Sequence, residues 1–167
     1  MTQSWDRIYT PHRLEYLRGA NVSDDCPFCA APELNGGDTL DLVAHRGQLA
    51  YVVLNLYPYN AGHLLICPYR HVADYTELTD GERDEIAQLT QESMHTLRAI
   101  SGAQGFNLGM NQGSISGAGI AAHLHQHVVP RWGGDANFMP IIGETKVLPQ
   151  LLTQTRDLLQ EGWISSH

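Results

Sequence analysis

Histidine occupies every second position between residues 123 and 127, in the run His123-Leu124-His125-Gln126-His127. In an extended strand, alternate side chains lie on the same face, so this run would place its imidazoles side by side, about 6.5–7 Å apart at each step of two residues. Histidine is only intermediate in how often it is buried, and a buried imidazole needs hydrogen-bond partners. The run therefore predicts a strand whose histidine face carries chemistry or is satisfied by polar neighbours.

Spacing alone leaves three interpretations of this histidine face open. The rings can hold a metal, because imidazole is a common zinc ligand. One ring can act in catalysis with support from the others, or the rings can form a hydrogen-bonded cluster without chemistry. The preceding segment 113–119 is rich in glycine and serine. Clustered backbone N–H groups favour anions such as phosphate, although such a loop by itself is more often a turn. A nucleophilic histidine beside an anion-binding loop fits phosphoryl or nucleotidyl transfer.

Composition narrows the class of protein. The chain has 167 residues, of which 43% are hydrophobic and 17% charged, and this suits one globular domain. The formal net charge is -8 and Lys and Arg form no run, so binding to a nucleic-acid backbone is not expected. No apolar run reaches the roughly 18 residues of a membrane span, and no signal-peptide core is visible. We therefore expect a cytoplasmic protein that does not contact membranes.

Hydrophobic periodicity predicts an α+β fold with a mostly antiparallel sheet. Residues 48–56 and 63–67 are rich in β-branched and aromatic side chains and flank a Pro/Gly turn, which predicts a hairpin. The helix signal is strongest over 79–100, where Thr79 and Glu82 form a capping box. The remaining expected elements are strands at 106–112 and 123–132 and a last helix at 148–163.

Two motifs give the chain a resemblance to the histidine triad (HIT) family of nucleotide hydrolases and transferases. The first is the histidine run, which follows the family pattern His-apolar-His-apolar-His-apolar-apolar except at Gln126. The second is the stretch 55–68, which has a Gly-His pair before its second strand. The resemblance over 40–132 implies the HIT fold, with a long central helix and a C-terminal helix. The domain it implies spans 1–167, with an arm and Cys-pair loop at 1–39, a core at 40–132 and an extension at 133–167.

The resemblance also implies roles for individual residues. His125 would attack the α-phosphorus and form a nucleotidyl-histidine, His127 would contact the phosphate oxygens, and His63 would support the triad by hydrogen bonding. Asn55 matches a position that binds the ribose hydroxyls, and Asn111 one that contacts the phosphate or the leaving group. The implied phosphate loop contains Ser114, Ser116, Gly117 and Gly119. Many family members carry a polar side chain where this chain has Gly119, so the serines are expected to supply that contact.

Three of these residues also have a purely structural interpretation. Asn55 can cap the turn at 57–62, since asparagine is a common turn former. Asn111 can be a hydrogen-bonding group at the end of a strand. His63 can be a core histidine whose ring nitrogens are satisfied by its neighbours. The residue types and their spacing do not decide between these interpretations and the roles in nucleotide binding.

The pair Cys26-Pro27-Phe28-Cys29 has the spacing of zinc ligands. A redox Cys-x-x-Cys is the alternative, but that motif expects a helix directly after it, which the following residues do not favour. Some HIT branches, including the galactose-1-phosphate uridylyltransferases, hold zinc with such a pair, a histidine after the second strand and the first triad histidine. The resemblance therefore implies a structural zinc on Cys26, Cys29, His71 and His123, and it implies no organic cofactor.

Two further segments, 7–17 and 129–139, resemble a bacterial subgroup that includes diadenosine tetraphosphate phosphorylases. This implies a dinucleoside polyphosphate as substrate, with inorganic phosphate as a possible second one. Arg131 and Lys146 are candidate anion contacts, and Trp132 can stack on a base or pack at an interface. The family resemblance implies a homodimer or a higher homo-oligomer. A nucleoside phosphoramidate hydrolase and a non-catalytic nucleotide-binding regulatory module remain the alternative functions.

Overall fold

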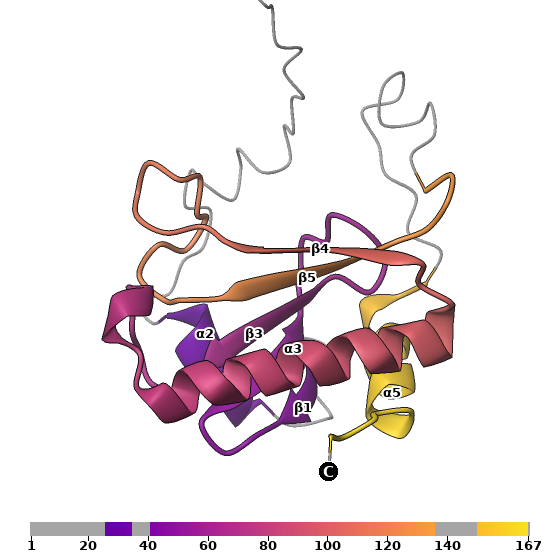
Figure 1. Ribbon diagram of the computed structural model, residues 1–167, viewed down its shortest axis with the longest axis horizontal. Helices are drawn as coiled ribbons and strands as arrows, with labels where there is room; N and C mark the ends of the chain where they lie inside the picture. The colour runs from indigo at the N-terminus through magenta and orange to yellow at the C-terminus, as the bar shows by residue number, and fades with distance from the viewer. Residues whose placement is uncertain (1–25, 35–40, 136–149, 167) are drawn as a thin grey trace, which may run out of the picture.

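The sheet of the protein is antiparallel throughout and has the strand order β1-β2-β3-β5-β4 (Figure 1). These observations come from a computed structural model, which describes residues 26–34, 41–135 and 150–166. The strands are β1 (Val43–Arg46), β2 (Ala50–Leu54), β3 (Leu64–Pro68), β4 (Gly105–Met110) and β5 (Gln126–Arg131). The predicted α+β class and the predicted hairpin of β2 and β3 are both confirmed.

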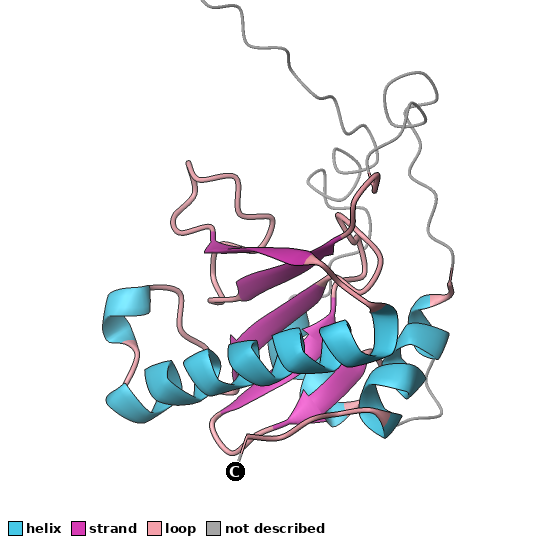
Figure 2. Cartoon of the chain, turned by 45° about the vertical axis from the view of Figure 1, so that its right-hand side comes forward, coloured by secondary structure: helices cyan, strands magenta, loops and turns pink. Residues whose placement is uncertain are grey.

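Two helices of different length pack on this sheet, and the other helical elements are short. The long helix α3 (Asp80–Ser101) crosses one face, and α5 (Leu152–Glu161) packs beside it against β1 (Figures 1 and 2). The short elements are α2 (Pro27–Ala30) and the 3₁₀ turns η1 (Ala31–Glu33) and η2 (Tyr75–Glu77). No helix in the described part of the chain has both the length and the apolar character needed to cross a membrane.

Helix α3 begins and ends where its sequence signals predict. Thr79 accepts a hydrogen bond from the backbone N–H of Glu82 (3.2 Å), and the Glu82 carboxylate accepts one from the backbone N–H of Thr79 (2.8 Å), which is the capping box. Gly102 ends the helix with a φ of 64°, in the left-handed region that glycine adopts without a steric penalty. Ile86, Leu89 and Leu97 form its buried face.

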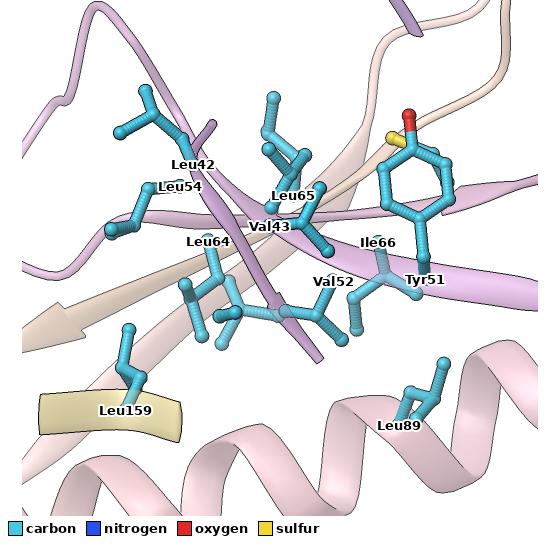
Figure 3. Close-up of a cluster of buried hydrophobic side chains, with 14 of the residues drawn as sticks. Leu42, Val43, Tyr51, Val52, Leu54, Leu64, Leu65, Ile66, Leu89 and Leu159 are labelled. Carbon is cyan, nitrogen blue, oxygen red and sulfur yellow. The ribbon is translucent and has the colours of Figure 1, made fainter. Parts of the chain in front are cut away.

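The core lies between the central strands and the two long helices. All five residues of β2 and all five of β3 are buried, because both strands have a neighbour on each side and are covered on both faces. Figure 3 shows Leu89 of α3 and Leu159 of α5 approaching the sheet from one side, while Tyr51 points away from α3. Strand β3 therefore provides a rigid base for the loop residues that follow it.

The structure corrects the prediction for the histidine run. Strand β5 begins only at Gln126, so His123 and His125 lie in the loop before it, and His127 is the one histidine of the run within the strand. The backbone N–H of Leu124 donates to the carbonyl of Val72 (2.7 Å), which draws this stretch onto the loop after β3. The three rings therefore do not share one strand face. Residues 1–25 of the N-terminal arm and the candidate anion contact Lys146 lie outside the described residues.

Replacing Glu82 with glutamine is expected to lower the free energy of unfolding by about 2 kcal/mol at pH 7. Its buried carboxylate accepts hydrogen bonds from Arg70 (2.7 and 2.9 Å) as well as from Thr79, and these bonds lower the pKa of Glu82 from 4.5 to about 2. Because the folded-state pKa is lowered, this stabilisation is present above pH 4.5 and is lost as the pH falls toward 2.

Urea unfolding of the two proteins across this pH range measures the effect. The difference between wild type and Glu82→Gln should narrow steadily below pH 4.5. Asp84→Asn, on the exposed side of α3, is the matched control and should change stability by less than about 0.5 kcal/mol. A difference that stays constant down to pH 2 would contradict this explanation of the cap.

Candidate functional site

His63 and His127 form a hydrogen-bonded pair with defined protons. The backbone N–H of Tyr59 lies 3.0 Å from Nδ1 of His63, and because a backbone N–H can only donate, this Nδ1 must be the acceptor. The proton of the neutral His63 ring is therefore on Nε2, which lies 2.9 Å from Nδ1 of His127. His63 thus donates to His127, and the ring proton of a neutral His127 is placed on its other nitrogen, Nε2.

His125 is held in the complementary tautomer. Its Nδ1 lies 2.8 Å from the backbone carbonyl of His123, and because a carbonyl can only accept, the proton is on Nδ1. Nε2 therefore carries the lone pair. Burial lowers the pKa of His125, so the neutral ring with a nucleophilic Nε2 is favoured near pH 7. The ring of His127 is 5.1 Å away, centroid to centroid, in an edge-on arrangement.

The ring of His123 lies against the cysteine loop. Its Nε2 lies 2.9 Å from the carbonyl of Pro68, which places the ring proton on Nε2 and leaves Nδ1 as an electron-pair donor. That Nδ1 lies 3.4 Å from Sγ of Cys26 and 3.5 Å from Sγ of Cys29, while Nδ1 of His71 lies 3.2 Å from Sγ of Cys29. The four ligand atoms lie within 4.8 Å of one another.

This cysteine-histidine group has the chemistry and spacing of a tetrahedral metal site. Zinc–sulfur and zinc–nitrogen bonds of about 2.3 and 2.05 Å place a sulfur and a nitrogen ligand about 3.6 Å apart, close to the separations seen here. The hydrogen bond from His123 to the Pro68 carbonyl is the kind of outer contact that fixes the tautomer of a metal-binding histidine. The group can therefore hold a metal ion on the four residues that the resemblance implied.

Asn55 and its neighbours shape the turn that carries His63. The side-chain oxygen of Asn55 accepts a hydrogen bond from the backbone N–H of Tyr57 (3.0 Å), and its amide nitrogen lies 3.3 Å from Nδ1 of His63. Asn55 therefore caps this turn, as its structural interpretation predicts. Asn60 fixes the other end of the turn, donating to the carbonyl of Pro130 and to the carboxylate of Asp135, both at 2.9 Å.

The register of β4 and β5 places the start of the candidate phosphate loop at the level of the histidine run. Met110 pairs with Gln126, so Asn111, half-buried at the end of β4, follows at the level of His125. Gly113 and Gly117 adopt φ values of 77° and 82°, which only glycine takes readily. The hydroxyl of Ser116 donates to the carbonyl of Gly113 (2.8 Å) and so serves the turn itself. Ser114 and Gly119 lie exposed in the same loop.

Two other candidates from the sequence have structural partners. The guanidinium of Arg131 forms an ion pair with Asp135 (2.6 Å) and donates to the side chain of Asn107 (2.8 Å). The indole N–H of Trp132 donates to the carbonyl of Ser101 (3.0 Å). Arg131 is thus held by a carboxylate at the end of β5 and is not positioned as an anion contact.

A family model for the HIT domain matches residues 41–134, which is more than half of the chain. The chain belongs to the HIT family. It is also 48% identical to an AP-4-A phosphorylase of Mycobacterium tuberculosis over 165 residues, which cover 94% of this chain and 84% of that relative. A bis(5'-nucleosyl)-tetraphosphatase (asymmetrical) of Schizosaccharomyces pombe is 28% identical over 56% of this chain and 50% of its own length.

Solved structures of HIT proteins have the same fold. A zinc-bound histidine triad family protein from Mycobacterium smegmatis superposes with a TM-score of 0.65 at 24% identity, over 83% of this chain and 92% of its own. A histidine triad nucleotide-binding protein from Sulfolobus tokodaii gives a TM-score of 0.66 at 24% identity, over 82% of this chain and 91% of its own. The predicted HIT fold is therefore confirmed.

One aromatic residue in this HIT site escaped the sequence analysis. Phe28 lies between the two cysteines, and its ring contacts both His123 and His125, with centroids 5.6 and 4.9 Å apart. Its place in the Cys-x-x-Cys loop was visible in the sequence. The contact with His125 was not, because the two residues are far apart along the chain and meet only through the fold.

Proposed function

We propose that this HIT protein is an enzyme that cleaves dinucleoside polyphosphates, with diadenosine tetraphosphate as a substrate, through a nucleotidyl-histidine on His125. The observation that carries the proposal is the proton arrangement of the rings: His125 keeps a lone pair on Nε2, and the pair of His63 and His127 keeps a proton on Nε2 of His127. A nucleophile beside a hydrogen-bond donor, which stabilises the charge that develops on the phosphate oxygens, suits displacement at phosphorus. The similarity to the mycobacterial AP-4-A phosphorylase supports the choice of substrate.

The reaction divides into two displacements at one phosphorus. In the first, Nε2 of His125 attacks the α-phosphorus, the bond to the polyphosphate breaks, and the polyphosphate leaves as an anion that accepts a hydrogen bond from Nε2 of His127. The carbonyl of His123 stabilises the positive charge on the modified imidazole through its bond to Nδ1. In the second, an oxygen of inorganic phosphate attacks, the P–N bond breaks to restore the lone pair on Nε2 of His125, and the proton of the attacking phosphate passes to solvent. Diadenosine tetraphosphate and phosphate thus give ATP and ADP.

The remaining site residues would hold the substrate. We propose that Asn55 binds the ribose hydroxyls in addition to capping its turn, and that Asn111 contacts the phosphate or the leaving group. The loop with Ser114, Ser116, Gly117 and Gly119 would bind the α-phosphate, mainly through backbone N–H groups. Exposure of this loop and its glycine geometry support such a role.

The metal in this proposal is zinc, held by Cys26, Cys29, His71 and His123. When bound, it would supply a cross-link between the cysteine loop and the core, with no part in the chemistry at phosphorus. Two sulfur and two nitrogen ligands with all four protein positions filled are typical of a structural zinc site. His123 would then serve the metal through its side chain and catalysis only through its carbonyl group.

We also propose that the chain forms one domain over 1–167 and works in the cytoplasm as a homodimer. Strand β4 lies at the edge of the sheet and exposes half of the Leu108 side chain, and an exposed edge strand is a template for pairing with another copy. Sedimentation velocity tests this part of the proposal: a monomer at micromolar concentration would contradict it.

Product analysis tests the function directly. The protein is incubated with diadenosine tetraphosphate, with and without inorganic phosphate, and the nucleotides are separated by chromatography. We expect ATP and ADP to appear only when phosphate is present. Formation of AMP and ATP, or of two ADP, without phosphate would show hydrolysis and contradict phosphorolysis. An absence of turnover under both conditions would contradict cleavage of this substrate and favour a phosphoramidate substrate or a binding module.

Replacing His63 with phenylalanine is expected to lower kcat by about 10- to 100-fold. The phenyl ring fills the buried site but cannot donate to Nδ1 of His127, so the proton on Nε2 of His127 is no longer fixed. His63→Gln keeps a donor and should recover part of the rate. Steady-state kinetics of both variants, with His95→Phe on the exposed side of α3 as the control, measure the effect. Equal rates for His63→Phe and His63→Gln would contradict the hydrogen-bond role.

A further inference from the structure

Phe28 connects the metal-holding loop to the catalytic histidine. Its ring lies between two imidazoles, edge-on to His123 at 5.6 Å (69° between planes) and tilted against His125 at 4.9 Å (40°). The first imidazole belongs to the metal group and the second to the proposed nucleophile. Figure 1 shows the short helix α2, which contains Phe28, beside strand β3. Among the ring contacts of the described residues, those of Phe28 link the metal-holding group directly to His125.

The backbone of Phe28 is fixed from several directions. The buried hydroxyl of Tyr51 donates to its carbonyl (2.6 Å), from the face of the sheet opposite α3. On either side, the thiols of Cys26 and Cys29 lie against His123 and His71. These contacts fix the backbone that carries the ring, so a movement of the loop would move the ring relative to His125. A metal bound to the two cysteines would hold that loop in place.

The ring of His125 needs such a support. Its bond from Nδ1 to the carbonyl of His123 fixes one edge of the imidazole, but one hydrogen bond leaves the ring free to tilt about that edge. His127 contacts it edge-on at 5.1 Å, and Phe28 supplies a second ring contact. In-line attack at phosphorus demands a defined direction of the Nε2 lone pair, and a misplacement of about 1 Å can cost roughly 100-fold in rate.

We propose that Phe28 is a positioning residue for His125, and that the metal-holding loop sets the orientation of the nucleophile through this ring. This inference rests on the proposed function of His125. It gives the metal site a second role beyond cross-linking, since loss of the metal would release Phe28 and so loosen the imidazole. Most of the effect of metal removal on the rate would then pass through Phe28 and would be lost when the ring is absent.

The test combines a substitution with metal removal in the full chain. Phe28→Ala is compared with Phe28→Leu and with Phe106→Ala, the same substitution at another partly buried phenylalanine packed on the core. We expect Phe28→Ala to lower kcat by about 10- to 100-fold, with KM changed by less than about threefold. Chelation should lower kcat in wild type and in Phe106→Ala, but it should lower kcat much less in Phe28→Ala, because both changes remove the same support. Phe28→Leu should recover part of the rate.

A second measurement is independent of turnover. NMR of ¹⁵N-labelled histidine reports whether Nδ1 of His125 keeps its proton and its bond to His123. Both Phe28→Ala and the chelated wild type should show exchange between tautomers at His125, whereas Phe106→Ala should not. This readout separates the inference from the proposed function, because a wild type that fails to turn over diadenosine tetraphosphate refutes the function while the NMR comparison still decides the role of Phe28.

Four results would overturn the inference. An increase in KM with kcat retained would assign the ring of Phe28 to substrate binding. Equal losses in Phe28→Ala and Phe106→Ala would assign it to general packing. Additive effects of chelation and Phe28→Ala would show that the metal acts by another route. A His125 signal unchanged in Phe28→Ala would show that the ring does not orient the imidazole.

Discussion

Replacing His125 with alanine is expected to lower kcat for diadenosine tetraphosphate by at least about 10⁴-fold, because removing a catalytic nucleophile removes the whole two-step route. The side chain is buried and makes its hydrogen bond to a backbone carbonyl, so its loss leaves no charged group without a partner. Substrate affinity should change by less than about threefold, since the proposed ribose and phosphate contacts remain. Chromatography of the products and calorimetric titration with the substrate measure the two quantities.

Chemical trapping makes this expectation sharper. Substrate labelled with ³²P in the α-phosphate should leave an acid-labile label on wild type during turnover and none on His125→Ala. His95→Ala, an exposed histidine on α3, is the control for general effects of losing an imidazole and should keep both rate and label. Label on the His125→Ala protein, or a rate within tenfold of wild type, would show that another group attacks phosphorus.

Replacing both Cys26 and Cys29 with serine is expected to lower the free energy of unfolding by about 4 kcal/mol, the value for a metal present at about 1,000 times its dissociation constant. For a chain of this size that corresponds to a fall in Tm of about 8–16 °C. The four ligands belong to segments far apart in the sequence, with Cys26 and His123 separated by 97 residues, so the metal closes a long loop. Calorimetry measures Tm, and elemental analysis measures the zinc content.

Chelation provides the matched comparison for this prediction. Wild type with its metal removed should melt close to the double serine variant, and a chelator should leave the melting of that variant unchanged. Elemental analysis should find about one zinc per wild-type chain and none in the variant. A wild type purified with no metal, or a variant that retains one, would contradict the assignment of the site.

Much of the fold was visible in local patterns. The capping box at Thr79, the helix-ending Gly102 and the Pro/Gly turn before His63 each act over a few residues, so the sequence predicted the helix and the hairpin closely. Strand β1 was missed because its four residues alternate too briefly to stand out. The start of β5 was misplaced because it depends on a bond between Leu124 and Val72, which no local pattern announces.

For the candidate site, too, local sequence patterns indicated the residues, whereas the contacts between distant segments required the structure. Motifs and a family resemblance, which are properties of the sequence, pointed to His63, His125, His127 and the four cysteine and histidine residues that could hold a metal. The proton positions came only from the structure, because they follow from which nitrogen faces a backbone N–H and which faces a carbonyl. Phe28 shows the limit most clearly, since its contact with His125 arises between segments that no motif connects.

The pairing of β3 with β5 affects how prone the chain is to aggregate while it is being synthesised. His63 meets His127 only after 64 further residues have been synthesised, and such non-local contacts form slowly. Until then β3, whose residues are all buried in the folded protein, has β2 on one edge and an open edge on the other. An open apolar edge invites aggregation. The late pairing of β5 with β3 therefore covers this edge and also brings the rings of His63 and His127 together, so we expect a translation product that stops before β5 to aggregate.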